Sequence, residues 1–347
     1  MLLTLTLILA FANGANDVSK GIATLVGSGV SSYRTAVMWG SFCTVIGALT
    51  ATLMSRGLVE MFSGKGILVH PSTSPHFVLA VACGAIGWLL IATRTGLPVS
   101  TTHSLAGALV GAAGWNGVQW SAIGAKVALP LAVSPVIALL LLLIVLPLLR
   151  PLTSRLDRFC VCIEQSTPVT PDGFAMREAM PSVTVASSCS TPVARVGAID
   201  AMHWISAGAT SFFRALNDTP KIVALGIAAM ALSGASLYAL VALAMGAGSL
   251  IAGLRVTRTL AEKIVPITPA NGFAANVVTS LLVGLASRFA LPVSTTHVSS
   301  GAIVGIGISE GGRGLRWKTI GEMLLAWVVT LPVSALIAAG VYAVVGC

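Results

Sequence analysis

Long apolar segments recur along nearly the whole chain, each close to the roughly 20 residues that an α-helix needs to cross the hydrocarbon layer of a membrane. They lie at about 2–12, 18–31, 35–54, 77–93, 98–115 and 121–149, and again at 201–213, 219–233, 235–254, 271–288, 292–308 and 319–346. Only 9% of the 347 residues are charged, against roughly 25% in soluble domains. The sequence therefore predicts an all-α, multi-pass membrane protein with about twelve membrane segments.

Residues 150–200 separate the two series of apolar segments. This stretch is rich in Pro, Ser, Thr and charge, and it opens with Arg150, Arg155 and Arg158. It is too polar to span a membrane, so we expect a central linker between a first membrane repeat at 1–149 and a second at 201–347. Because basic residues near span ends are retained inside, the arginines favour a cytoplasmic linker, with both termini outside. Such loops explain the excess of 20 Lys and Arg over 11 Asp and Glu without a nucleic-acid partner.

Two features do not change this prediction. The first apolar run, at 2–12, lacks a basic n-region and continues into a polar motif that recurs later, so we expect it in the mature protein. Cys160 and Cys162 lack the second Cys or His pair of a zinc site. We therefore expect neither a metal or disulfide framework nor a cofactor.

Two motifs occur once in each half of the chain. The heptapeptide LPVSTTH occupies 97–103 and again 291–297, and Asn-Asp-x-x-Lys occurs in ANDVSK at 15–20 and LNDTPK at 216–221. The offsets are 217 − 16 = 201 and 291 − 97 = 194, so order and approximate spacing are kept. This is an internal duplication. Short segments interrupted at matched positions predict broken or re-entrant helices around a midplane binding site, and an odd number of crossings per half would make the repeats inverted.

The LPVSTTH motifs have the composition of an oxyanion site. Pro98 and Pro292 suit the first turn of a helix, where unpaired N–H groups and the helix dipole attract anions. The hydroxyls that would add donors for phosphate are Ser100, Thr101, Thr102, Ser294, Thr295 and Thr296. Alternatively, these hydroxyls only cap helices or join them. Exact duplication beside a matched acidic motif favours the functional interpretation.

His103 and His297 end the two motifs. Each could contact a ligand, carry a proton or satisfy a structural hydrogen bond. We favour the structural role.

The acidic residues Asp17 and Asp218 lie within apolar segments, where an ionisable group indicates function. A bare carboxylate would repel phosphate, so a bound cation, a proton or a basic neighbour must neutralise it. The first two would couple anion entry to a cation gradient. Asn16 and Asn217 add the neutral oxygens that a hard cation such as Na⁺ prefers. An Asx cap on a broken helix is the alternative.

Lys20 and Lys221 each follow the aspartate by three residues and would share a helical face with it. Two interpretations stay open. The pair is a structural ion bridge, or the lysine stands where a cation would otherwise bind and helps to hold the anion.

The motifs resemble the inorganic phosphate transporter family, which includes sulfate permeases. The resemblance rests on NGANDVSKGIATLVGSG at 13–29, GLPVSTTH at 96–103, ANGFAANVVTSLLVG at 270–284 and ALPVSTTH at 290–297. It implies a twelve-segment helical fold with inverted repeats, a homodimer, and symport of phosphate with Na⁺ or H⁺. Carried over by position, it assigns the Asn-Asp pairs to the ion and anion site and both hydroxyl triplets to phosphate.

This chain departs from the family pattern at two matched positions. The family commonly reads GANDVAN in both halves, where this chain has Ser19 and Lys20 in the first half and ALNDTPK in the second. Each half thus carries a lysine in place of a neutral residue. The change bears on the number and identity of the coupling ions, and on whether phosphate or sulfate is preferred.

Together with the resemblance to this family, the residues predict a secondary active phosphate symporter of the cell membrane, coupled to Na⁺ or H⁺ and working by alternating access. A permease for sulfate or a related oxyanion, and a passive anion channel, are the alternatives. Buried acids in both halves count against an anion channel. An intramembrane enzyme using Ser, His and Asp is disfavoured, because an asymmetric reaction rarely needs two equal sets of residues, and no HExxH signature is present.

Overall fold

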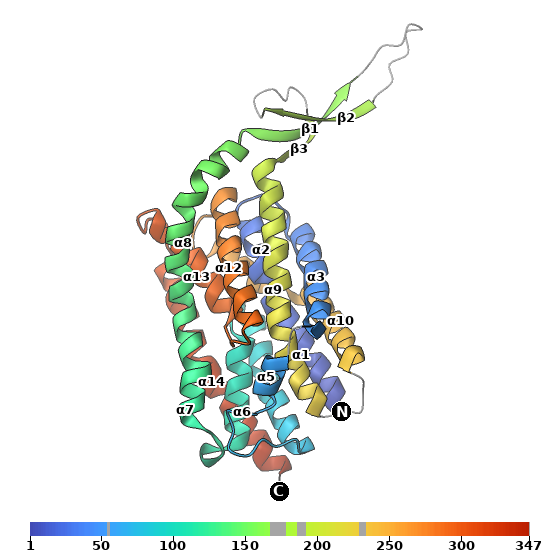
Figure 1. The fold of residues 1–347 in the computed structure, drawn as a ribbon, viewed down its shortest axis with the longest axis vertical. Helices are drawn as coiled ribbons and strands as arrows, with labels where there is room; N and C mark the ends of the chain where they lie inside the picture. Colours follow the sequence, from blue (N-terminus) through green and yellow to red (C-terminus); the bar gives the residue numbers. More distant parts are fainter. Residues whose placement is uncertain (54–55, 167–177, 186–191, 229–233, 347) are drawn as a thin grey trace.

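The chain folds into a long helical bundle with a small β-sheet projecting from one end (Figure 1). The computed structural model describes residues 1–53, 56–166, 178–185, 192–228 and 234–346. The chain is mostly helical, as the apolar segments predict. Seven helical spans within these residues are long and apolar enough to cross a membrane.

The helices fall into two series on either side of the sheet. The first series is α1 (Leu2–Asp17), α2 (Ser19–Gly27), α3 (Tyr33–Thr50), α4 (Arg56–Phe62), α5 (Pro75–Thr95), α6 (Thr101–Ala113), α7 (Trp120–Ile123) and α8 (Leu129–Leu156). Short 3₁₀ helices lie at Ala51–Leu53 and Trp115–Gly117, and a π-helical turn lies at Gly124–Ala128. The second series is α9 (Ala198–Ala228), α10 (Gly234–Ala252), α11 (Leu254–Glu262), α12 (Pro269–Arg288), α13 (Thr295–Ser309) and α14 (Trp317–Val345).

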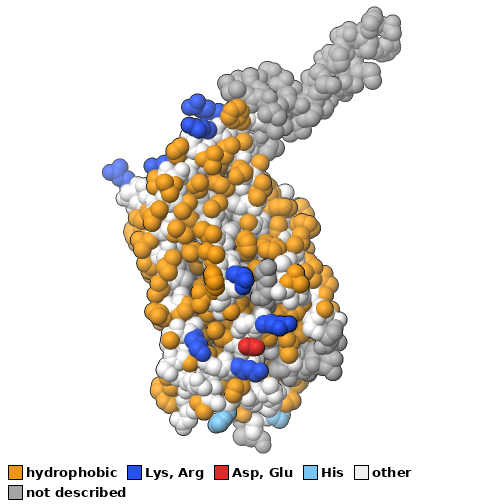
Figure 2. Space-filling view, viewed as in Figure 1, with side chains coloured by type: hydrophobic (Ala, Val, Ile, Leu, Met, Phe, Trp, Pro, Cys, Tyr) orange, Lys and Arg blue, Asp and Glu red, His pale blue; other side chains and the backbone are white. Residues whose placement is uncertain are grey.

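Exposed apolar side chains cover much of the bundle surface. Figure 2 shows hydrophobic side chains spread over much of one face, with Lys and Arg near the end that carries the sheet and again, beside an acidic side chain, in the half away from it. Leu148 on α8, Ile251 on α10 and Val328 on α14 are each 70% exposed or more. A water-soluble protein would bury such residues, so this surface is suited to lipid tails.

Two helical hairpins bring the LPVSTTH motifs to the middle of the bundle. In Figure 1, α5 and α6 lie in the half of the bundle away from the sheet, and α12 and α13 lie in the half nearer to it. The α5–α6 turn is possible because Gly96 ends α5 with φ 76°, a left-handed conformation that favours glycine. Helices α6 and α13 have only 13 and 15 residues, too few to cross the hydrocarbon layer.

Each hairpin is covered by the last long helix of the other half, α14 on α5–α6 and α8 on α12–α13. Glycine permits these contacts at equivalent positions. A Cβ on Gly107 of α6 would lie 2.3 Å from the Leu331 carbonyl oxygen of α14, and one on Gly301 of α13 would lie 2.3 Å from that of Pro135 on α8. Close approach at small residues drives helix association in membranes, where the hydrophobic effect does not act between helices.

The Asn-Asp motifs interrupt the helices less than we expected. Helix α9 runs unbroken through Asn217, Asp218 and Pro220, where the sequence suggested two segments. Pro220 has no N–H to donate to the carbonyl one turn earlier, yet the helix continues past it to Ala228. Tertiary packing can maintain a membrane helix through a proline. In the first half, only Val18 separates α1 from α2, and its backbone is still right-handed helical.

The described part of the 150–200 segment is structured. Helix α8 continues to Leu156, and the strands β1 (Phe159–Ser166), β2 (Glu178–Val185) and β3 (Pro192–Gly197) form an antiparallel sheet in the order β2-β1-β3. Cys160 is buried in β1, and the side chain of Cys162 lies outside the described residues. The segment therefore adds strands at the end of an otherwise helical protein.

Candidate functional site

The tips of the two hairpins lock together through reciprocal hydrogen bonds. The Thr102 hydroxyl donates to the Val293 carbonyl at 3.3 Å, and the Thr296 hydroxyl donates to the Val99 carbonyl at 2.7 Å. Each threonine thus binds the loop that forms the first part of the other motif. The two duplicated hydroxyl motifs, 194 residues apart in sequence, meet at one place.

The serine of each motif caps its own helix. Ser100 Oγ accepts the His103 N–H and Ser294 Oγ accepts the His297 N–H, both at 3.2 Å. Capping holds the first turn of α6 and of α13 in place. The serines therefore cap their helices, while the threonines Thr101 and Thr102 make contacts beyond their own helix.

The two aspartates converge on one asparagine. Asn13 Nδ2 donates to Asp17 Oδ2 at 3.0 Å and lies 3.3 Å from Asp218 Oδ2 and 2.9 Å from Thr101 Oγ1. Thr101 in turn donates to Asp17. The acidic motifs of both halves and one hydroxyl motif therefore form a single cluster.

Each aspartate is paired with the lysine of its own motif. Lys20 forms an ion pair with Asp17, and Lys221 Nζ lies 3.0 Å from Asp218 Oδ1. The lysines also reach the hairpin tips, because Lys20 donates to the Val99 carbonyl at 3.4 Å and Lys221 to the Val293 carbonyl at 3.3 Å. Lys221 donates in addition to Thr102 Oγ1 at 2.7 Å. The two lysines occupy equivalent places in the two halves.

The asparagines of the Asn-Asp motifs hold the loops of the hairpins. Asn16 Nδ2 donates to the Leu97 carbonyl at 3.1 Å, and Asn16 Oδ1 accepts the Val99 N–H at 3.3 Å. Asn217 Nδ2 donates to the Val293 carbonyl at 3.2 Å. All predicted site residues are at most 3% exposed, and they are Asn16, Asp17, Lys20, Ser100, Thr101, Thr102, Asn217, Asp218, Lys221, Ser294, Thr295 and Thr296.

Arg214 is a site residue that the sequence reasoning missed. It is fully buried, its Nη1 donates to Asn13 Oδ1 at 3.1 Å, and its Nη2 donates to Thr44 Oγ1 at 2.6 Å. Its Nε has no hydrogen-bond partner among the described residues. A signal was present in the sequence, because 214 − 13 = 201, the offset that relates Asp17 to Asp218. Arg214 therefore stands where the first half has Asn13.

The rings of the two motif histidines, His103 and His297, pack against each other in a tilted arrangement. Their ring centroids are 4.7 Å apart, and His297 also packs on Trp327 at 3.9 Å. His297 Nδ1 lies 2.9 Å from the Leu131 carbonyl oxygen. These contacts support the structural role favoured for the histidines.

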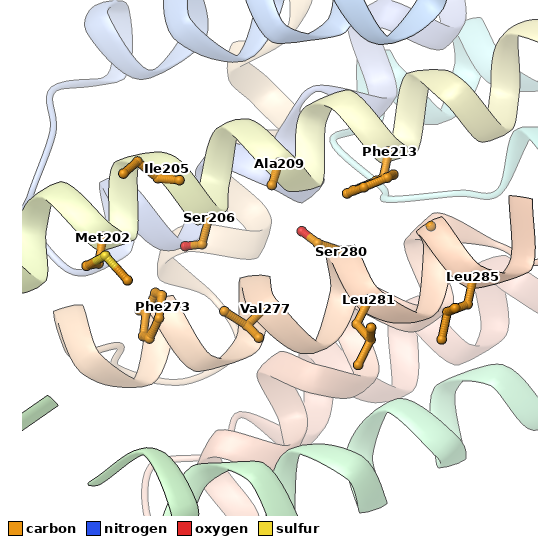
Figure 3. A pocket seen from close by; sticks show the side chains of 11 residues that line it. Met202, Ile205, Ser206, Ala209, Phe213, Phe273, Val277, Ser280, Leu281 and Leu285 are labelled. Atoms are coloured by element: carbon orange, nitrogen blue, oxygen red, sulfur yellow. The ribbon is translucent and has the colours of Figure 1, made fainter. Parts of the chain in front are cut away.

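An apolar groove between α9 and α12 lies apart from this cluster (Figure 3). It has a volume of about 510 Å³ and is lined by side chains such as Ile205, Phe213 and Leu281. Its two serines, Ser206 and Ser280, are engaged in hydrogen bonds inside the protein. The groove offers no charged donor to an anion, so the buried cluster is the better candidate site.

Comparison with known proteins agrees with this architecture. The sequence model described as the phosphate transporter family matches residues 13–338, almost the entire chain. The chain belongs to the phosphate transporter family. The resemblance deduced from the motifs is thereby confirmed, and this family member is an integral membrane protein and a transporter rather than an enzyme.

Relatives of this family member resemble it over most of their length. A probable low-affinity inorganic phosphate transporter of Mycobacterium bovis is 29% identical, covering 96% of this chain and 74% of the relative. The protein of the same description from Rhizobium meliloti is 28% identical, covering 98% and 94%. A solved structure titled the sodium-dependent phosphate transporter superposes with a TM-score of 0.78 at 24% identity, covering 99% of this chain and 98% of the other. That similarity establishes the shared fold.

Proposed function

We propose that this protein carries inorganic phosphate across the plasma membrane as a secondary active transporter, driven by a gradient of Na⁺ or H⁺. The observation that carries the proposal is the meeting of both hydroxyl motifs with a buried cluster of basic side chains. Donors from hydroxyls and ammonium groups can replace the water shell of a tetrahedral anion. The relatives described as inorganic phosphate transporters support phosphate as the substrate.

The arrangement of the hairpins supports alternating access as the mechanism in this proposal. The α5–α6 and α12–α13 hairpins approach the cluster from opposite ends of the bundle (Figure 1), so the proposal includes two inverted repeats with a site near the membrane midplane. Separation of one hairpin tip at a time would expose the cluster to one side. The Thr102–Val293 and Thr296–Val99 contacts are the bonds that must break and re-form.

Uptake into proteoliposomes tests this proposal. Purified protein should accumulate radiolabelled phosphate above its outside concentration when a Na⁺ or H⁺ gradient is imposed, and stop when the gradient is collapsed. Flux that only equilibrates phosphate would instead identify a passive channel. Stronger uptake of sulfate than of phosphate would identify a sulfate permease.

The homodimer implied by the family resemblance remains a prediction. Because the bundle exposes apolar side chains over a wide surface, lipid and a second subunit could each cover part of it. The mass of the detergent-solubilised protein, measured by light scattering, distinguishes one subunit from two.

A further inference from the structure

The buried cluster carries more positive than negative charge. Five ionisable side chains other than histidine lie in it, each at most 1% exposed: Asp17, Asp218, Lys20, Lys221 and Arg214. With all five ionised, the sum is +3 − 2 = +1. No other Asp, Glu, Lys or Arg forms an ion pair with them among the described residues.

The lysine ammonium groups use the oxygen atoms that a bound Na⁺ would need. Lys221 Nζ contacts the Asp218 carboxylate, the Thr102 hydroxyl and the Val293 carbonyl. Lys20 contacts the Asp17 carboxylate and the Val99 carbonyl. Carboxylate, hydroxyl and carbonyl oxygens are the ligands of hard cations. A Na⁺ at either carboxylate would have to displace an ammonium that is covalently part of the chain.

Arg214 supplies the charge that the aspartates do not balance. Its described hydrogen bonds go to neutral oxygens of Asn13 and Thr44, and it forms no ion pair within 4.0 Å among the described residues. An uncompensated buried charge is costly. A guanidinium offers several donors in a planar fork that fits a tetrahedral oxyanion. A bound anion would remove this cost.

We propose that Lys20 and Lys221 act as built-in counter-cations in place of sodium, and that Arg214 binds a univalent oxyanion, so that transport requires no Na⁺. This inference rests on the proposed function and narrows it, because it leaves the proton gradient as the driving force. A univalent anion such as dihydrogenphosphate brings the cluster to neutrality. Sulfate, with two charges, would leave a net negative charge buried.

The first test measures sodium dependence of the wild-type protein. Phosphate uptake into proteoliposomes under a fixed pH gradient should be the same within about twofold in Na⁺ and in choline buffer, and a Na⁺ gradient alone should drive no accumulation. A fall of about tenfold or more in choline would overturn the inference while leaving phosphate transport intact. Absence of uptake under every gradient would instead contradict the proposed function.

The second test removes the built-in cation. Lys20→Asn and Lys221→Asn each leave a carboxylate without its ion-pair partner, so uptake should fall in choline and recover in Na⁺. Arg313→Gln, in an exposed loop, is the matched control and should not respond to Na⁺. If the lysine variants remain equally active in both buffers, the lysines are only structural bridges.

The third test measures whether Arg214 is needed for anion binding. Phosphate should raise the melting temperature of the purified wild-type protein, and arsenate, which forms a univalent anion of the same shape, should act similarly while sulfate acts weakly. In Arg214→Gln the phosphate-induced shift should be lost without a fall in the anion-free melting temperature, and Arg214→Lys should retain part of the shift. A lower anion-free melting temperature with an unchanged phosphate shift would show that Arg214 is merely structural. Equal effects of sulfate and arsenate would overturn the preference for a univalent anion.

Discussion

The charged side chains in the buried cluster stabilise one another as ion pairs, so each aspartate has to be considered together with its lysine. Asp17 and Lys20 are three residues apart, so one helical turn brings them together. The sequence was sufficient to predict this pair and its counterpart in the second half, because charged residues within apolar segments stand out. It was not sufficient to predict that Asn13 bridges both aspartates and Arg214. That junction depends on how α1 and α9 pack, which spacing within one helix does not specify.

Breaking one buried pair should destabilise the protein more than removing both partners. In sodium-free buffer, Asp17→Asn or Lys20→Gln leaves an unpaired buried charge, and we expect each to lower the free energy of unfolding by about 3–5 kcal/mol. The double variant should lose less than the sum of the two. Thermal unfolding of the four proteins in detergent measures this coupling. Lys65→Gln, at an exposed site, should change little, and strictly additive losses would contradict a direct ion pair.

Helices and loops were predictable to different degrees. Apolar periodic segments and the Pro-Val-Ser-Thr-Thr motifs placed α5, α6, α12 and α13 close to their observed positions. The expected break at the second Asn-Asp motif was wrong, because Asn, Asp and Pro weaken an isolated helix while packing against neighbouring helices maintains α9. The strands β1 to β3 were not expected, since their segment lacks the regular apolar alternation that would have indicated them.

Contacts between each hairpin and its covering helix should be sensitive to a single methyl group. Gly107→Ala and Gly301→Ala each place a Cβ against a main-chain carbonyl, so the covering helix has to move. We expect each variant to lose about 1–3 kcal/mol of stability. Gly321→Ala is the control, because no atom lies within 4 Å of the added Cβ. Its melting temperature should stay the same or rise slightly, and equal losses in all three variants would contradict the close-approach argument.

In the whole molecule, the two duplicated halves pack on each other in the same way, because the last long helix of each half covers the hairpin of the other half. The two hairpins occupy opposite halves of the bundle, and α8 and α14 exchange partners between the repeats (Figure 1). The duplication could be predicted from the motifs, but this packing could not, because it joins helices from different halves of the chain that are far apart in the sequence.

If the repeats are inverted, equivalent loops of the two halves should lie on opposite sides of the membrane. Asn116 follows α6 and Arg313 follows α13, and both are exposed. In a cysteine-free background, Asn116→Cys should react with an impermeant maleimide from outside the cell, and Arg313→Cys only after the membrane is opened. The arginines at the start of the linker set this expectation for the cytoplasmic side. Labelling of both cysteines from the same side would contradict inverted repeats.

The packing of α8 and α14 on the hairpins of the opposite halves also has a consequence for biosynthesis. When the ribosome has completed the first half, the α5–α6 hairpin still lacks α14, which is made near the end of the chain. The polar tip of that hairpin would then face lipid, where unsatisfied groups are costly. We therefore expect the nascent first half to remain with the insertion machinery, or to be recognised as incomplete by membrane proteases, until α14 has been released and has packed against it.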